Sequence, residues 1–227
     1  SRDGMESTWE IAQHPLTDLG SGGNAIGMGL EFAKTILAAE TDPDVVVGII
    51  NHALGATAIQ WWAPGAPHTK KNRPGTSSPY YLYDEAVTRT TAALSYGKLR
   101  GVLWHQAEYN SNNNSNPASE PSLYAGRLAA LVDNLRSSFS DPSLPFVCGK
   151  MVPSSWVNEG GQTILYTGLP NRATVESALM NLPNQRSNTA CVSNTDLRGM
   201  DDEKIHFDAY SQRLLGQRYA SEIQSMY

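Results

Sequence analysis

Short apolar runs alternate with longer segments of helical periodicity along most of this chain. The runs that predict buried strands lie at 45–50, 99–104, 145–152 and around Cys191. The segments that predict helices lie at 29–40, 82–94, 122–139, 171–180 and 210–226. Strands that alternate with helices of about ten or more residues indicate a mainly parallel sheet covered on both faces. Ligands bind such sheets beyond the carboxyl ends of the strands, so we expect the functional residues there.

The composition favours one acidic, water-exposed domain. The 227 residues suffice for one sizeable core, and no composition shift suggests a second domain. A formal charge of −5 argues against a nucleic-acid-binding protein, which normally has a basic face. No run of about 18 apolar residues is present, so we expect no membrane span. Charged residues make up only 17% while Ser and Asn are abundant, which leads us to expect an extracellular or periplasmic protein. The oligomeric state is left open.

Polar residues that could carry chemistry follow several of the expected strands. The sequence WHQAEYN at 104–110 directly follows an apolar run. Gly55 follows the run at 45–50, where its N–H could face an oxyanion or simply form a tight turn. His206 comes three residues after Glu203 and just before the last helix. A carboxylate at that spacing can hold an imidazole in one tautomer; a surface histidine among charges is the alternative.

Metal, stacking and thiol chemistry have weaker signals. His105 and Glu108 are three residues apart on an extended segment, with no further His or Cys at ligand spacing, so we expect no metal and no other cofactor. The tryptophan pair at 61–62 is expected to pack a loop, with a platform for a sugar ring as the alternative. Cys148 and Cys191 are expected to be buried free thiols, because a disulfide depends on a Cα separation that sequence does not supply.

Short motifs in a fixed order cover nearly the whole chain. They are WEIAQHPL (9–16), GATAIQW (55–61), WHQAE (104–108), EKIHF (203–207) and LGQRYA (215–220). In this order and spacing the chain resembles carbohydrate esterase family 6 and the sialate O-acetylesterase-like branch of the SGNH hydrolases. The resemblance implies a single SGNH-type domain over 1–227, folded as a three-layer α/β/α sandwich with a mainly parallel, flavodoxin-like sheet. It also implies a serine esterase that removes O-acetyl groups from a carbohydrate substrate such as acetylxylan or a sialic acid.

The same resemblance assigns roles to individual residues. His206 matches the family's general base, which takes the proton of a serine hydroxyl. The carboxylate that orients this base matches either Glu203 or Glu108. The donors to the tetrahedral oxyanion match the Gly55 N–H and the Gln106 side-chain amide.

The family's GQSN block, which contains the nucleophilic serine, is absent. Ser21 in GSGGN (20–24) imitates it faintly, and Ser1 resembles the loop just ahead of the tryptophan motif. We expect an upstream segment of roughly 20–40 residues that carries the serine and the first strand. That strand lies inside the family's sheet, and its loss would leave unpaired backbone edges in the core. The alternative is a non-catalytic carbohydrate-binding relative.

Smaller departures concern glycines and one carboxylate. Ala56 and Ala107 stand where the family has glycine, and Ala107 would be strained if its backbone needed a positive φ. The family's aspartate three residues before the histidine is Glu203 here, with Asp202 one residue earlier. Glutamate also serves as an orienting carboxylate, so this change is mild.

Overall fold

A parallel sheet forms the centre of the molecule. The computed structural model describes residues 9–16, 26–69, 72, 77–112 and 120–227. In that part of the chain, β1 (Val102–Trp104), β2 (Phe146–Gly149) and β5 (Thr189–Val192) pair in the order β1-β2-β5. The register places Leu103 opposite Val147, and Val147 opposite Ala190. All three strands therefore end at the same edge of the sheet, where the sequence predicts the functional residues.

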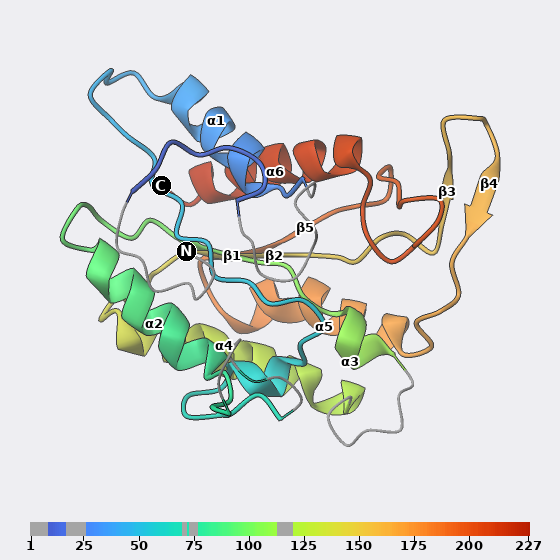
Figure 1. Cartoon of the computed structure of the whole chain (residues 1–227), viewed down its shortest axis with the longest axis horizontal. Helices are drawn as coiled ribbons and strands as arrows, with labels where there is room; N and C mark the ends of the chain where they lie inside the picture. The colour runs from blue at the N-terminus through green and yellow to red at the C-terminus, as the bar shows by residue number, and fades with distance from the viewer. Residues whose placement is uncertain (1–8, 17–25, 70–71, 73–76, 113–119) are drawn as a thin grey trace.

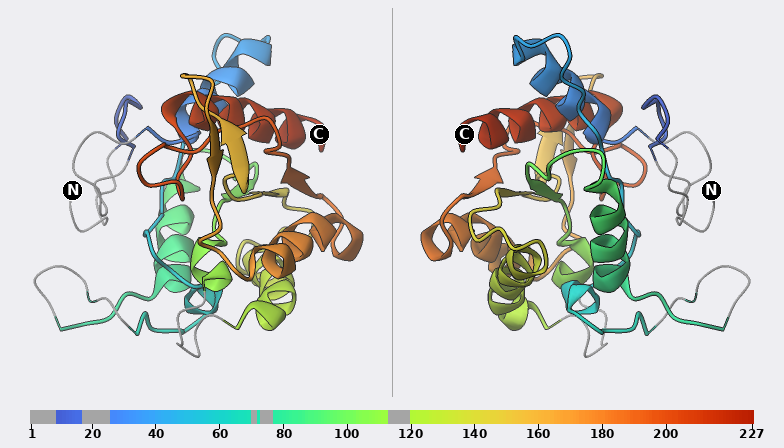
Figure 2. Two further views of the ribbon diagram at one scale, coloured as in Figure 1. Left: turned by 90° about the vertical axis from the view of Figure 1, so that its right-hand side faces the viewer. Right: turned by 90° about the vertical axis from the view of Figure 1, so that its left-hand side faces the viewer.

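Helices cover both faces of this sheet. One face carries α1 (Gly29–Ala39) and α6 (Ala209–Gln224). The opposite face carries α2 (Leu82–Ala93), α4 (Tyr124–Ser138) and α5 (Arg172–Gln185). Figures 1 and 2 show these layers from three sides. The arrangement is the predicted three-layer α/β/α sandwich with a mainly parallel sheet.

Strand alternation divides the core between the two faces. Phe146 and Cys148 of β2 pack in the cluster that includes the buried leucines of α4 and α5, whereas Val147 packs with α6. The apolar positions of α4, Leu128, Leu131, Val132 and Leu135, all face the sheet and are buried. This spacing at three and four residues is the helical pattern that the sequence displays.

The run at 45–50 does not form the expected strand. These residues pair with no described segment, and Val46 has 87% of its surface exposed. A β-branched run becomes a strand only when a neighbour satisfies its backbone groups and covers its side chains. Among the described residues no such neighbour lies beside it, so the prediction of a strand was wrong for this chain.

Further elements complete the described chain. They are the short helices η1 (Ile59–Trp62), α3 (Glu108–Ser111) and η2 (Pro121–Leu123), and the antiparallel hairpin β3 (Ser155–Val157) and β4 (Thr163–Leu165). The hairpin was not predicted, and α5 runs beyond the expected end at Met180, through Pro183. No helix in the described part of the chain is long and apolar enough to cross a bilayer.

Candidate active site

The loop before α6 holds His206 through its own backbone. The Met200 N–H donates to the His206 carbonyl at 2.9 Å, and Gly199 forms a bridge with Phe207. Asp208 then caps α6, because its carboxylate accepts the Ser211 N–H at 2.7 Å. The loop and the helix start are thus fixed to each other, and His206 stands two residues ahead of the cap.

Glu203 and His206 are in direct contact. The His206 Nδ1 hydrogen-bonds to the Glu203 Oε2, and both side chains remain open to solvent, at 64% and 54% exposed. A carboxylate on Nδ1 orients the ring and leaves Nε2 to accept a proton from a nucleophile. Asp202 instead accepts the Glu203 N–H at 2.8 Å. Of the carboxylates considered from the sequence, Glu203 is the one that contacts the imidazole.

His105 and Glu108 form a second pair at the end of β1. The His105 Nε2 lies 3.7 Å from the Glu108 Oε1, and the Glu108 Oε2 accepts the Ala107 N–H at 3.0 Å. Burial lowers the pKa of His105; the Glu108 charge opposes this, and the His206 charge adds to it. The His105 ring also lies 5.6 Å, between centroids, from the ring of Phe207, which follows His206. The WHQAE and EKIHF motifs therefore meet at the carboxyl edge of the sheet.

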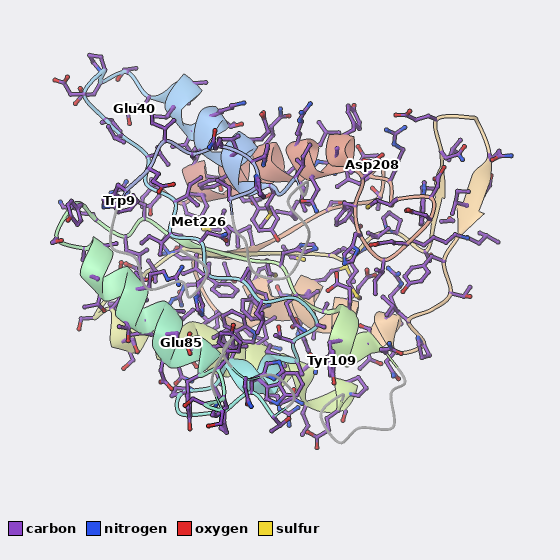
Figure 3. The ribbon with its side chains drawn as sticks, viewed as in Figure 1. Trp9, Glu40, Glu85, Tyr109, Asp208 and Met226 are labelled. Carbon is purple, nitrogen blue, oxygen red and sulfur yellow. The ribbon has the colours of Figure 1, made fainter. Side chains whose placement is uncertain are left out.

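Figure 3 labels a residue from each of the two helical layers that flank this edge. Asp208 at the start of α6 and Tyr109 on α3 lie toward the end of the molecule that carries the β3–β4 hairpin. One comes from the helical layer above the sheet in this view and the other from the layer below. The expected site therefore draws on segments about a hundred residues apart in sequence.

The Gln106 amide is used inside the protein. Its Nε2 donates to the Thr57 carbonyl at 2.7 Å and to the Asn110 Oδ1 at 3.0 Å, which engages both of its hydrogens. In this arrangement the side chain ties the segment after Gly55 to α3, and the amide expected to face an oxyanion has no further hydrogen to donate. Gly55 itself is exposed, with open space where a Cβ would stand.

The two alanines that replace family glycines differ in backbone. Ala56 has φ +58°, in the left-handed region that favours glycine. Ala107 has φ −168°, which any residue adopts. The strain expected at Ala107 is therefore absent, and the strained replacement is Ala56.

Sequence reasoning missed two buried polar groups that organise the site. Asn110, fully buried, accepts the Ile59 N–H at 2.9 Å and so fixes η1 to α3. Tyr219 of α6, also fully buried, donates to the Trp104 carbonyl at 2.7 Å and lies 3.4 Å from the His105 Nδ1. Tyr219 belongs to the LGQRYA motif, which was the available signal.

The remaining expectations concern the tryptophan pair, the serine nucleophile and a metal site. Trp61 and Trp62 are buried and pack the loop, with Trp61 stacked on His68 at 4.1 Å. Ser1 and Ser21 lie outside the described residues. Within the described ranges, no serine hydroxyl is hydrogen-bonded to His206, and no group of three or more His, Cys, Asp or Glu side chains is placed to hold a metal ion.

The matching family model and the curated relative are both described as carbohydrate esterases. A family model described as carbohydrate esterase, sialic acid-specific acetylesterase, matches residues 2–225. A probable carbohydrate esterase of Arabidopsis thaliana is 29% identical over 142 residues, which are 61% of this chain and 48% of that protein. The chain therefore spans about half the length of the curated relative it matches.

Solved structures share the fold. An Arabidopsis thaliana protein superposes with a TM-score of 0.71 at 26% identity, over 96% of this chain and 77% of that one. A structure described as a carbohydrate acetylesterase from Xanthomonas citri gives a TM-score of 0.61 at 22% identity, over 88% of this chain and 40% of that one. NanS gives 0.63 at 16% identity, over 92% of this chain and 75% of that one.

Proposed function

Because the chain belongs to the sialic acid-specific acetylesterase family of carbohydrate esterases, we propose that it removes O-acetyl groups from a carbohydrate. The observation that carries this proposal is the contact between Glu203 and His206 at the carboxyl edge of the sheet. An exposed imidazole with a carboxylate on one nitrogen is the base that a serine esterase needs. Its exposure leaves room for an acetylated sugar to reach the reacting atoms.

The proposed reaction proceeds through an acyl-enzyme. His206 Nε2 takes the proton of a serine hydroxyl as the serine oxygen attacks the acetyl carbonyl. The imidazolium, held by Glu203, then returns this proton to the sugar oxygen as the ester bond breaks. Water, activated by the same base, releases acetate and restores the serine. The Gly55 N–H is proposed as a donor to the oxyanion of both tetrahedral steps.

Gln106 and Glu108 are proposed as positioning residues for this site. Gln106 fixes the segment that follows Gly55 through the Thr57 carbonyl. Glu108 accepts the Ala107 N–H of its own turn and lies beside His105, whose ring packs near that of Phe207, the residue after His206. Displacement of either side chain would shift the oxyanion donor or the charge around the base without touching the substrate.

The nucleophilic serine is proposed to come from outside the described residues. An upstream segment of roughly 20–40 residues that supplies both a strand and this serine remains our proposal. Two features support it: β1 is an edge strand in the described sheet, and the apolar run at 45–50 pairs with no described strand. N-terminal sequencing and intact mass of the natural protein test it; a natural start at Ser1 would contradict it.

The substrate class is proposed to be an O-acetylated sialic acid, with acetylated xylan as the second candidate. The family description names the first, and the name of the curated relative supports a carbohydrate ester in general. An extracellular or periplasmic location would suit either substrate. Acetate release from both substrates, measured side by side on the natural protein, separates them.

The decisive experiment compares turnover in the natural protein with that of its His206→Ala variant. We expect p-nitrophenyl acetate turnover to fall by about 10²–10⁴-fold, because general-base catalysis contributes that much. Lys34→Ala, at an exposed side chain of α1 that pairs with Glu31, serves as the control and should retain activity. Sugar binding without any ester hydrolysis by the natural protein would reject the esterase and favour the non-catalytic carbohydrate-binding alternative.

A further inference from the structure

Cys148 and Cys191 stand opposite each other on neighbouring strands. The parallel ladder of β2 and β5 pairs Cys148 with Cys191 in direct register. Adjacent strands lie about 4.8 Å apart, and disulfides form between Cα atoms separated by about 4.4–6.8 Å. The fold thus supplies the separation that the sequence alone does not.

The two side chains also share one face of the sheet. Cys148 and Cys191 both pack in the core cluster on the α4 and α5 side, while their neighbours Val147 and Ala190 pack on the α6 side. The Cys148 Sγ lies 3.4 Å from the Ala190 carbonyl oxygen, which belongs to the peptide bond leading into Cys191. The sulfur of Cys148 therefore already lies against the strand that carries Cys191.

The thiols differ in exposure and in acidity. Cys148 is fully buried, whereas Cys191 on the outer strand β5 is partly exposed. A hydrogen bond from the Cys148 thiol lowers the pKa of Cys191, burial opposes this, and the Lys150 ammonium assists it. The same hydrogen bond, together with burial, raises the pKa of Cys148. Cys191 is thus the more exposed and the more acidic of the two thiols, and Cys148 is the buried, less acidic one.

We propose that Cys191 and Cys148 are an oxidisable pair that closes into an intrachain disulfide on reaction with a peroxide. The Cys191 thiolate attacks one peroxide oxygen, the O–O bond breaks, and Cys191 becomes a sulfenic acid as hydroxide leaves. The Cys148 sulfur then attacks the Cys191 sulfur, and the sulfenic oxygen leaves as water with the Cys148 proton. Overall, two thiols lose two electrons and hydrogen peroxide is reduced to two molecules of water.

The bond would join β2 to β5 just before both strands end at the site. Gly149 and Lys150 follow Cys148, and Val192 follows Cys191. These residues lead into the loops at the carboxyl edge, so oxidation would fix the spacing of the sheet below them. This role is independent of ester hydrolysis and can be tested on a protein without any esterase activity.

The test treats the fully reduced protein with hydrogen peroxide, unfolds it, alkylates it with iodoacetamide and measures its intact mass. We expect the loss of two hydrogen atoms, no alkylation, and a proteolytic fragment in which the peptides of Cys148 and Cys191 are linked. Two alkylated thiols after excess peroxide would overturn the proposal. So would added oxygen on either sulfur as the main product, or disulfide-linked dimers.

Single variants test the assigned order of the two sulfurs. In Cys148→Ser, Cys191 should stop at the sulfenic acid and be trapped by dimedone; in Cys191→Ser, Cys148 should resist peroxide. Equal reactivity of the two variants would contradict this order. Brief alkylation of the folded, reduced wild-type protein tests which sulfur reacts first without a substitution. Cys191 should label at least about tenfold faster than Cys148, and faster labelling of Cys148 would overturn the assignment.

Discussion

At the scale of single residues, backbone conformation separates two substitutions that look alike in the sequence. Ala56 and Ala107 both replace glycines of the resembled family, and the sequence drew attention to Ala107. The structure places only Ala56 in the left-handed region, at φ +58°. An alanine there carries a steric cost that glycine does not have, because its Cβ approaches the neighbouring carbonyl.

Ala56→Gly is therefore expected to raise the free energy of unfolding by about 0.5–1 kcal/mol. Ala107→Gly is the matched control, since Ala107 is buried at φ −168°. It should lower the free energy of unfolding, because glycine adds backbone entropy to the unfolded chain and removes a buried methyl group. Urea denaturation of both variants measures the difference, and equal shifts would contradict the interpretation.

Glu203→Gln tests the orienting carboxylate in the natural protein. We expect kcat to fall by about 10²-fold or more while KM changes little, since Glu203 contacts the base and not the sugar. Asp201→Asn in the same loop, where the carboxylate accepts a hydrogen bond from Asn158, controls for loop charge and should keep its activity. Equal losses in both variants would show that loop charge, rather than the Glu203 contact, supports turnover.

His105 makes stability depend on pH. Its pKa is lowered in the folded protein by burial, so the unfolded chain, with a pKa near 6.5, binds the proton more tightly. The unfolded state thus gains protons first, and stability is lost as the pH falls from about 6.5 through the lowered folded pKa. Replacing this histidine, in His105→Asn, should flatten the decline in unfolding free energy between about pH 7 and pH 5. An unchanged slope would show that the pKa of His105 is the same in the folded and the unfolded state.

At the scale of elements, α6 shows why the LGQRYA motif has its pattern. Leu215 and Ala220 are fully buried, and Tyr219 reaches the Trp104 carbonyl at the end of β1. Gly216 lies against α1, where a Cβ would meet the Met28 carbonyl and come within 2.9 Å of the Phe32 nitrogen. Helices approach this closely only where one of them lacks a side chain.

Gly216→Ala should accordingly destabilise the protein by about 1–3 kcal/mol, because the added methyl group forces α1 and α6 apart. Gly126→Ala in α4 is the control at another helical glycine, with no atom within 4 Å of the added carbon. That variant should be stabilised by about 0.5–1 kcal/mol from helix propensity. Thermal unfolding of the pair distinguishes crowding from propensity, and a stabilised Gly216→Ala would contradict the close approach.

Most helices and three strands could be predicted from the sequence, and the reasons for the failures are physical. The α4 leucines repeat at helical spacing, and the β2 run is apolar because all its residues are buried. Residues 45–50 are also apolar and rich in β-branched side chains, but such a run forms a strand only when a neighbouring strand pairs with it. The β3–β4 hairpin has exposed Val157 and Leu165, so it lacks the alternation that signals a half-buried strand.

The candidate site was predictable only in part. The three-residue spacing of Glu203 and His206 pointed to their contact, which the structure contains. The hydrogen bond from Gln106 to the Thr57 carbonyl could not be foreseen, because Thr57 lies 49 residues earlier in the chain, whereas the other partner, Asn110, is only four residues away. Side-chain direction at a strand end depends on such distant contacts rather than on the local motif.

At the scale of the whole molecule, stability should decrease from the centre of the sheet outward. The β2 strand is paired on both sides and fully buried, whereas residues 46–50 form no backbone–backbone hydrogen bond with the described part of the chain. In the 227-residue chain, amide hydrogen exchange should therefore be slowest at Phe146–Gly149 and close to that of an unfolded peptide at 46–50. Comparable protection of the two segments would mean that a partner strand covers the outer run in solution.

The two ends of α6 have a joint consequence for how the site responds to disturbance. The helix begins at Ala209, three residues after His206. Further along the same helix, Tyr219 donates a hydrogen bond to the Trp104 carbonyl at the end of β1, beside His105. A shift of α6 along its axis would therefore move His206 and pull the end of β1 in the same direction. His206 and the end of β1 would therefore shift together, and the distance between them would vary less than the position of either one.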